Sequence, residues 1–337
     1  MRRVAILIAI LLAALPGAAW SQPSVEDFYR GKKIDLVIGY SPGGTYDLYA
    51  RLIARHLGNH LPGRPLILPR NMPGAGSRTA ATFVHGLAPR DGTVLATADQ
   101  SLALQQAAGD PRIKFDTTRF IYIGNPNVEN NTTVTRHTSG IRTIEDARRR
   151  EATMGATGGS TSSQYPKAMN ALLGTKFRII LGYPGGNDIN LAMERGEVDG
   201  RGSNSWASWK ATRPHWLAEK KINILVQIGL KKTPDLPDVP LLMDLGANAE
   251  DRALLRLLSA STEIGRPIFT TPGVPAERVA ALRAAFQAML KDPAFLDEAK
   301  KENFDIDPVS GGAMQKLVAD MVAVPKAQGE RLKKIIE

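Results

Sequence analysis

Short apolar runs alternate with longer segments of helical spacing along most of the chain. Residues 32–39 (KKIDLVIG) form the first run, which is apolar and β-branched and predicts a buried strand. Residues 47–60 follow with leucines spaced along one face, which predicts an amphipathic helix with Thr45 available as its N-cap. Because this order of strand, loop and helix recurs, the chain predicts an α/β fold with mostly parallel sheets flanked by helices.

The repeats fall into two sets, which indicates two lobes, and the chain is longer than one hydrophobic core usually organises. A capping box of Thr143 and Asp146 marks the first helix of the second set. The further predicted strands are 64–71, 92–101, 152–157, 177–183, 222–229 and 266–271, and the further predicted helices are 77–87, 143–151, 164–173, 187–195 and 276–290. We expect lobe I to comprise residues 22–125 and 258–337, and lobe II to comprise residues 126–257.

Four glycine-containing loops share one construction, since each follows a predicted strand and precedes a predicted helix. They are SPGGT (41–45), PGAGS (73–77), TGGSTS (157–162) and PGGN (184–187). A helix N-terminus carries free N–H groups and about half a positive charge, and glycine lets an anion approach the backbone closely. Tight strand-to-helix turns alone also favour glycine, so one such loop proves little. Four of them, two in each half, favour a shared anion site beyond the carboxyl ends of the strands.

The four loops contain no lysine or arginine, so a bound carboxylate would be held mainly by backbone and hydroxyl groups. Each charge-assisted hydrogen bond contributes roughly 1.5–3 kcal/mol, so three or four can offset the cost of desolvating a carboxylate. The hydroxyl donors would come from Thr45, Ser77, Ser160, Thr161 and Ser162.

Sequence motifs of other kinds of site are incomplete or missing. Residues 74–79 (GAGSRT) lack the third glycine of a dinucleotide fingerprint, and the chain contains neither a P-loop nor a nucleophile elbow. A hydrolase or transferase would need a nucleophile and a base at recognisable spacing, and none is found. His56 and His60 stand four residues apart but lack a third metal ligand nearby, so a solvated helix face is the better interpretation.

Other polar and aromatic residues allow two interpretations. Asp47 and Asp188 fall in first helical turns, where capping is favoured over acid–base catalysis. Arg78 and Arg201 flank loops and could clamp a carboxylate, although an exposed surface arginine is the commoner outcome. The cluster Trp206, Trp209 and Trp216 fits either a cleft wall or a core.

The first residues predict an export signal at 1–21, with Arg2 and Arg3 before an apolar run that ends in small residues. Removing those two arginines lowers the formal charge from +10 to +8, and the remaining basic residues are scattered, which argues against nucleic-acid binding. No later segment has the length of a transmembrane helix, and the chain has no cysteine. We expect an exported, periplasmic monomer without disulfides, metal or cofactor.

An ordered set of motifs carries a family resemblance: IGYSPGGTYDLYARLIARHL, NMPGAGS, APRDGTVLA, GYPGGNDINLAMERGEVDG and LPDVPLL. With the export signal, this set resembles the periplasmic substrate-binding proteins of tripartite tricarboxylate transporters, the Bug family. The resemblance implies a two-lobed Venus-flytrap fold of the periplasmic-binding-protein type. It also implies a cleft that closes on a small organic acid, delivery to integral-membrane transporter subunits, and no catalysis. A periplasmic sensor that presents its ligand to a signalling partner would need the same fold and stays an alternative.

The resemblance also assigns ligand-binding positions, to which Arg201 is added as a candidate. In the first half these are Gly43, Gly44, Thr45, Asp47, Asn71, Pro73, Gly74, Ala75, Gly76, Thr97 and Gln100. In the second half they are Gly158, Gly159, Ser160, Thr161, Ser162, Tyr183, Gly185, Gly186 and Asp199. Two features depart from the family pattern, namely Ser77-Arg78 in the second loop and GRGSNSWASW after Asp199. An additional arginine at the cleft would favour a second ligand carboxylate, and tryptophans there would favour an aromatic or apolar tail.

Overall fold

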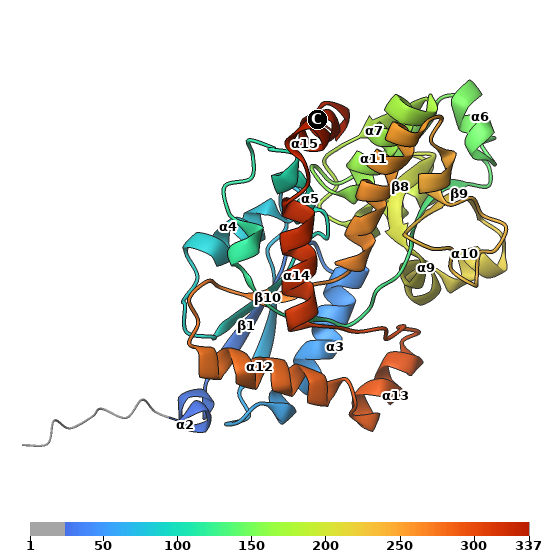
Figure 1. The fold of residues 1–337 in the computed structure, drawn as a ribbon. Coiled ribbons are helices and arrows are strands. Elements are labelled where there is room, and N and C mark those ends of the chain that lie inside the picture. The colour runs from blue at the N-terminus through green and yellow to red at the C-terminus, as the bar shows by residue number, and fades with distance from the viewer. Residues whose placement is uncertain (1–23, 337) are drawn as a thin grey trace, which may run out of the picture.

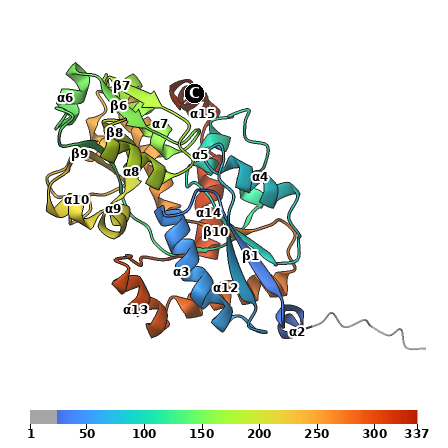
Figure 2. The same ribbon diagram turned by 180° about the vertical axis from the view of Figure 1, so that it is seen from behind.

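A computed structural model describes residues 24–336, which fold around two β-sheets with helices on their faces (Figures 1 and 2). The predicted export signal lies outside the described residues. Within residues 24–336, no helix is both long and apolar enough to span a bilayer. The predicted α/β fold with two lobes is confirmed.

Lobe I, as the term is used below, is the six-stranded sheet with the helices packed on it. Its strand order is β11-β4-β10-β3-β1-β2. The strands are β1 (Lys33–Ile38), β2 (Leu66–Asn71), β3 (Val94–Thr97), β4 (Ile121–Asn125), β10 (Ile268–Thr270) and β11 (Val309–Ser310). The helices are α2 (Val25–Tyr29), α3 (Thr45–His60), α4 (Arg78–Gly86), α5 (Leu102–Ala107), α12 (Ala276–Met289), α13 (Pro293–Lys301) and α14 (Gly311–Val322).

Lobe II is the five-stranded sheet, of order β7-β6-β8-β5-β9, with its helices. The strands are β5 (Asn131–Arg136), β6 (Ala152–Gly155), β7 (Phe177–Ile180), β8 (Gly200–Ser205) and β9 (Ile222–Ile228). The helices are α6 (Ile144–Arg149), α7 (Thr161–Leu173), α8 (Gly186–Arg195), α9 (Trp206–Thr212), α10 (Pro214–Ala218) and α11 (Ala249–Ala260). The exact residue boundaries proposed for the two lobes stay a prediction.

Most strands of each sheet run in one direction, as predicted, although each sheet also contains antiparallel pairs. In lobe I, β1 pairs in parallel with β2 and β3, whereas β10 runs antiparallel to β3 and β4. In lobe II, β6 pairs in parallel with β7 and β8, but β5 is antiparallel to β8 and β9. The chain enters the antiparallel strand β5 directly from β4 of the other sheet, with no helix between them, whereas α11 precedes the antiparallel strand β10.

Two predicted helix starts differ from the structure. Gly44 is the N-cap of α3 and Thr45 is its first helical residue, so the prediction of Thr45 as the cap was wrong. Helix α7 begins at Thr161, three residues before the predicted start, because the Ser160 hydroxyl accepts from the amide of Ser162. The capping box of Thr143 and Asp146 on α6 is confirmed.

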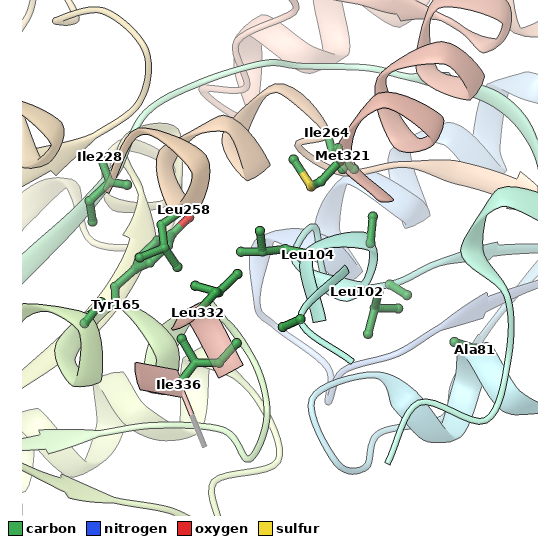
Figure 3. Packing of buried hydrophobic residues seen from close by; sticks show 14 of the residues in the cluster. Ala81, Leu102, Leu104, Tyr165, Ile228, Leu258, Ile264, Met321, Leu332 and Ile336 are labelled. Carbon is green, nitrogen blue, oxygen red and sulfur yellow. The ribbon is translucent and has the colours of Figure 1, made fainter. Parts of the chain in front are cut away.

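One hydrophobic cluster joins the two lobes. Its members include Leu104 on α5, Tyr165 on α7 and Leu258 on α11, all fully buried (Figure 3). Helix α15 (Lys326–Ile336) adds Leu332 and Ile336 to this cluster. Although α15 follows α14 on lobe I, it packs mainly against α7 of lobe II (Figure 1). The C-terminal section therefore packs on both lobes.

Candidate functional site

The first and fourth glycine loops face each other across the two lobes. Ser41 donates its hydroxyl hydrogen to Asp188 Oδ2 at 2.6 Å, although the two residues lie 147 positions apart. A Cβ atom added to Gly43 would lie 3.3 Å from Asn187 Nδ2, and one added to Gly185 would collide with Ser41. The starts of α3 and α8 therefore meet at one end of the interlobe contact.

The second and third loops meet in the same way. A Cβ atom on Gly76, whose φ is +63°, would lie 2.4 Å from the carbonyl oxygen of Gly158. On the same side, Gln105 donates from Nε2 to the carbonyl oxygen of Gly159 at 2.9 Å. Only glycine at position 76 allows the two backbones to approach this closely.

A cleft lies between these contacts, with about 730 Å³ of empty space including the part open to solvent. Its lobe I wall and floor contain Tyr40, Gly43, Gly44, Thr45, Tyr46, Asp99 and Gln100, and the linking segments add Glu129, Gly265 and Arg266. Its lobe II wall contains Asn131, Thr157, Ser160, Thr161, Ser162, Gly186, Asn187, Asn190, Arg201, Ser203, Asn204, Ser205, Ser208 and Thr212.

Arg201 on β8 is the cationic group of this cleft that has no ion-pair partner in the described part of the chain. Its guanidinium donates from one terminal nitrogen to Gly186 O and to Asn190 Oδ1, both at 3.1 Å, and lies 5.9 Å from the ring centre of Trp209. Its Nε is buried and has no hydrogen-bond partner. Burial lowers the pKa of Arg201 to about 9, so the group stays charged at neutral pH. Such a group favours an anionic ligand.

Arg266, the second cation of the cleft, is already paired. It is 4% exposed, forms an ion pair with Glu129, donates to the Ser205 hydroxyl and lies 4.4 Å from the ring centre of Tyr49. Burial alone would lower the pKa of Arg266, but the charge of Glu129 helps to raise it above its usual value. Because Glu129 and Arg266 lie on the two segments that connect β4 to β5 and α11 to β10, their pair joins the lobes at the base of the cleft.

Two tyrosines give the lobe I wall its aromatic surface. The rings of Tyr40 and Tyr46 lie 4.9 Å apart at an angle of 42°. Tyr40 donates its hydroxyl hydrogen to Asp99 Oδ2 at 2.5 Å, and Tyr46 donates to the carbonyl oxygen of Gly265 at 3.0 Å. Burial raises the pKa of both hydroxyls well above the usual value. With the hydroxyls engaged, these residues contribute mainly ring surface to the cleft.

Asp99 is a buried carboxylate at the floor of the cleft, 4% exposed. Its Oδ1 accepts from the amide of Ser101 at 2.9 Å and from the Ser101 hydroxyl, while Oδ2 accepts from Tyr40. The amide of Thr161, at the start of α7 in lobe II, also bonds to this carboxylate. Burial raises the pKa of Asp99, and these hydrogen bonds oppose the rise.

The structure brings many of the predicted ligand-binding residues to the cleft wall. These are Gly43, Gly44, Thr45, Gln100, Ser160, Thr161, Ser162, Gly186 and Arg201. They come from three of the four loops, from the segment after β3 and from β8.

The other predicted residues lie behind the wall or between the lobes. Asp47 accepts from the amide of Gly43 at 2.9 Å and from Asn71 at 2.8 Å, so both side chains shape the first loop from beneath. Asp199 accepts from the amide and the hydroxyl of Thr153, both at 2.8 Å, and so ties β6 to the start of β8. The remaining residues outside the lining are Pro73, Gly74, Ala75, Gly76, Thr97, Gly158, Gly159, Tyr183 and Gly185.

Contacts in the structure settle two open interpretations, that of Arg78 and that of the tryptophan cluster. Arg78 is 8% exposed and pairs with Asp110 at 3.1 Å, so it is neither a surface arginine nor part of the cleft wall. Trp209 and Trp216 pack in the core of lobe II, with ring centres 5.9 Å apart. Trp206 donates to an exposed aspartate outside the cleft lining.

The histidine interpretation was wrong. His56 pairs with Glu298 at 2.5 Å and His60 with Asp292 at 3.0 Å, so both hold α3 against α13 instead of facing water. No group of three potential metal ligands occurs among the described residues.

The sequence analysis missed most of the lobe II wall. Strands β5 and β8 were not predicted, because Asn131–Arg136 and Gly200–Ser205 are polar and lack apolar alternation. Within the segment GRGSNSWASW only Arg201 was a ligand-binding candidate, yet the segment also supplies Ser203, Asn204, Ser205 and Ser208 to the cleft. An unusually polar stretch after a predicted helix was the available signal.

The chain is similar to known proteins in sequence and in fold. No family model matches the chain. A Cupriavidus necator protein described as "UPF0065 protein in gbd 5'region" is 28% identical over 335 residues, which are 96% of this chain and 95% of the relative. The structure of the periplasmic binding protein BugD is similar with a TM-score of 0.73 and 20% identity, covering 92% of this chain and 99% of BugD. The resemblance to the Bug family is confirmed.

Two further structures with a similar fold were solved with ligands. MatC from Rhodopseudomonas palustris, with bound malate, has a TM-score of 0.71 at 19% identity and covers 91% of this chain and 99% of its own. An R. palustris protein with adipate has a TM-score of 0.68 at 20% identity, and the match covers 90% of this chain and 97% of the R. palustris protein. At this identity the similarity shows the fold, which is the two-lobed fold of periplasmic binding proteins.

Proposed function

We propose that this chain is an extracytoplasmic solute-binding protein that captures a small organic carboxylate between its lobes. It works without catalysis and hands the ligand to the integral-membrane subunits of a tripartite tricarboxylate-type transporter. The observation that carries the proposal is Arg201, a charged guanidinium with no ion-pair partner in the described chain, in a cleft walled by both lobes. The structures of similar fold with malate and adipate support the same ligand class.

The cleft chemistry fits one carboxylate well. A ligand carboxylate beside Arg201 would also lie near the start of α8, where Gly186 and Asn187 line the cleft and the helix dipole favours negative charge. The lobe II wall adds the hydroxyl and amide groups of Asn190, Ser203 and Ser208. A buried anion is stable only with such partners, and this wall offers several.

Binding is coupled to closure in this proposal, because the contacts come from both lobes. Thr45 and Tyr46 lie on lobe I, whereas Arg201 and Asn190 lie on lobe II. A ligand that touches all of them binds the closed state better than the open one, and so shifts the population toward closure. The transporter then meets a closed, loaded protein in the periplasm.

The test is thermal denaturation of the exported protein against a panel of small organic acids, with neutral amides of the same acids as controls. At a concentration 100 times the dissociation constant, a ligand adds about 2.7 kcal/mol to the free energy of unfolding. At least one acid should therefore raise the melting temperature by several degrees while its amide does not. If no acid shifts the transition at millimolar concentration, the proposed ligand class is wrong.

A further inference from the structure

Asp99 places a negative charge inside the proposed carboxylate site. It follows β3 directly, at the carboxyl end of the strand, and reaches the start of α7 in the opposite lobe. Tyr40, Ser101 and Thr161 all donate to it, so its oxygens are fully engaged by the protein itself.

The α7 end of the cleft is therefore already occupied. The amide of Thr161 bonds to Asp99, and the Ser160 hydroxyl accepts from the amide of Ser162. The hydroxyls of Ser160 and Ser162 bond to each other at 2.8 Å, and the Thr157 hydroxyl bonds to that of Ser160. In the third loop, which the sequence offered as an anion site, the hydroxyl groups of Thr157, Ser160 and Ser162 are therefore engaged with one another.

The charged residues of the cleft also disfavour a second ligand carboxylate. Arg266 is balanced by Glu129, which leaves Arg201 as the positive charge available to a ligand. Arg78, which could have served a second carboxylate, pairs with Asp110 outside the cleft. A second ligand carboxylate would meet Asp99 and Glu129 without a free cation.

We propose that Asp99 makes this site selective for acids that carry a single carboxylate group. The carboxylate of the ligand pairs with Arg201, and the uncharged remainder lies against the rings of Tyr40 and Tyr46. This selectivity rests on the proposed function, and it differs from that of the relatives solved with malate and adipate, which are dicarboxylates.

Matched acids test the selectivity on the unaltered protein. The pairs are butyrate with succinate, hexanoate with adipate, and benzoate with terephthalate, measured by titration calorimetry at one pH and ionic strength. In each pair that binds, the acid with one carboxylate should bind at least tenfold more tightly. A dicarboxylate that binds as tightly as its partner would overturn the selectivity but leave the proposed function standing. If no member of any pair binds, the proposed function fails and the selectivity with it.

A substitution separates Asp99 from the rest of the cleft. Asp99→Asn removes the charge and keeps the shape, and it should improve the affinity for the dicarboxylate relative to its partner at least tenfold. Asp188→Asn is the matched control, because Asp188 lies between the lobes but outside the cleft lining. It should leave the ratio of the two affinities unchanged. An equal change of the ratio in both variants, or no change in Asp99→Asn, would overturn the role of Asp99. If Asp99→Asn does not fold, the comparison of matched acids on the unaltered protein decides.

Discussion

Replacing Arg201 by methionine tests the electrostatic basis of the cleft. The substitution keeps an unbranched chain over the ring of Trp209 but removes the charge and the donors to Gly186 and Asn190. Removing one partner of a buried, hydrogen-bonded charge pair costs about 2–5 kcal/mol of binding free energy. Because 1.4 kcal/mol corresponds to a factor of ten, the affinity should fall about 30-fold to several thousand-fold.

The same change should affect the unliganded protein much less. Burial lowers the pKa of Arg201 to about 9, so keeping this side chain charged costs folding free energy, and an uncharged methionine avoids that cost. The two lost hydrogen bonds act in the other direction, at a net of about 1 kcal/mol each. Water in the open cleft reduces both effects. The free energy of unfolding should therefore change by no more than about 1–2 kcal/mol.

The assay is titration calorimetry with the acid that stabilises the protein most, and Arg136→Met is the control. Arg136 also lies in lobe II and donates to a backbone carbonyl, that of Val198, but it does not line the cleft. Its loss should change the affinity less than threefold. If Arg201→Met binds within threefold of the unaltered protein, or if both variants lose affinity equally, Arg201 is not the anion-binding group. For the unaltered protein the affinity should be nearly constant from pH 6 to 8, because Arg201 stays charged over this range even though burial lowers its pKa.

Three further predictions concern stability and closure. Asp47→Asn should cost about 1.5–3 kcal/mol at neutral pH, because burial raises the pKa of Asp47 but hydrogen bonds from Arg51, Gly43 and Asn71 outweigh it and hold that pKa below its usual value. In urea unfolding the difference from the unaltered protein should be complete well above the usual aspartate pKa and vanish as the pH falls through the lower folded-state pKa. Gly76→Val should abolish ligand binding, because a side chain at this position collides with the third loop, while the far-ultraviolet circular dichroism spectrum is retained. Gly109→Val is the control, since Gly109 has a similar φ of +68° but open space around it. This variant should lose stability but still bind the ligand. Leu332→Ala should lower the free energy of unfolding in denaturant by about 2–5 kcal/mol, whereas Leu296→Ala, at a side chain that is 39% exposed, should lower it by less than about 1 kcal/mol. Equal losses in the two variants would contradict a hydrophobic core beneath the C-terminal helix.

Regular strand–loop–helix units were the part of the fold that the sequence could predict. Residues 32–60 show why, since an apolar run, a glycine turn and a helical leucine pattern each report on local structure. The polar strands β5 and β8 could not be found in this way, because their buried threonine, serine and asparagine side chains are satisfied by partners distant in sequence. Thr133, for example, donates its hydroxyl hydrogen to the carbonyl oxygen of Gly202.

The candidate site likewise contains residues that local sequence patterns predict and residues that only distant contacts bring together. The glycine loops were visible as local patterns, and their convergence followed from the topology of α/β sheets. The cations of the cleft come from elsewhere, from β8 and from the segment before β10. Arg266 donates its backbone amide hydrogen to Asn125, 141 residues earlier, and no local pattern contains such a contact. His56 was misjudged for the same reason, since its partner Glu298 lies 242 residues away.

The placement of α15 has a mechanical consequence for a protein that opens and closes. In the described chain, the backbone passes between the lobes after β4, again before β10, and a third time where α14 on lobe I leads to α15 on α7. A third connection leaves two rigid bodies fewer relative movements than two connections do. Twisting and sliding are then restricted more than a simple swing. The guanidinium of one wall and the tyrosine rings of the other should therefore return to the same alignment each time a solute is enclosed.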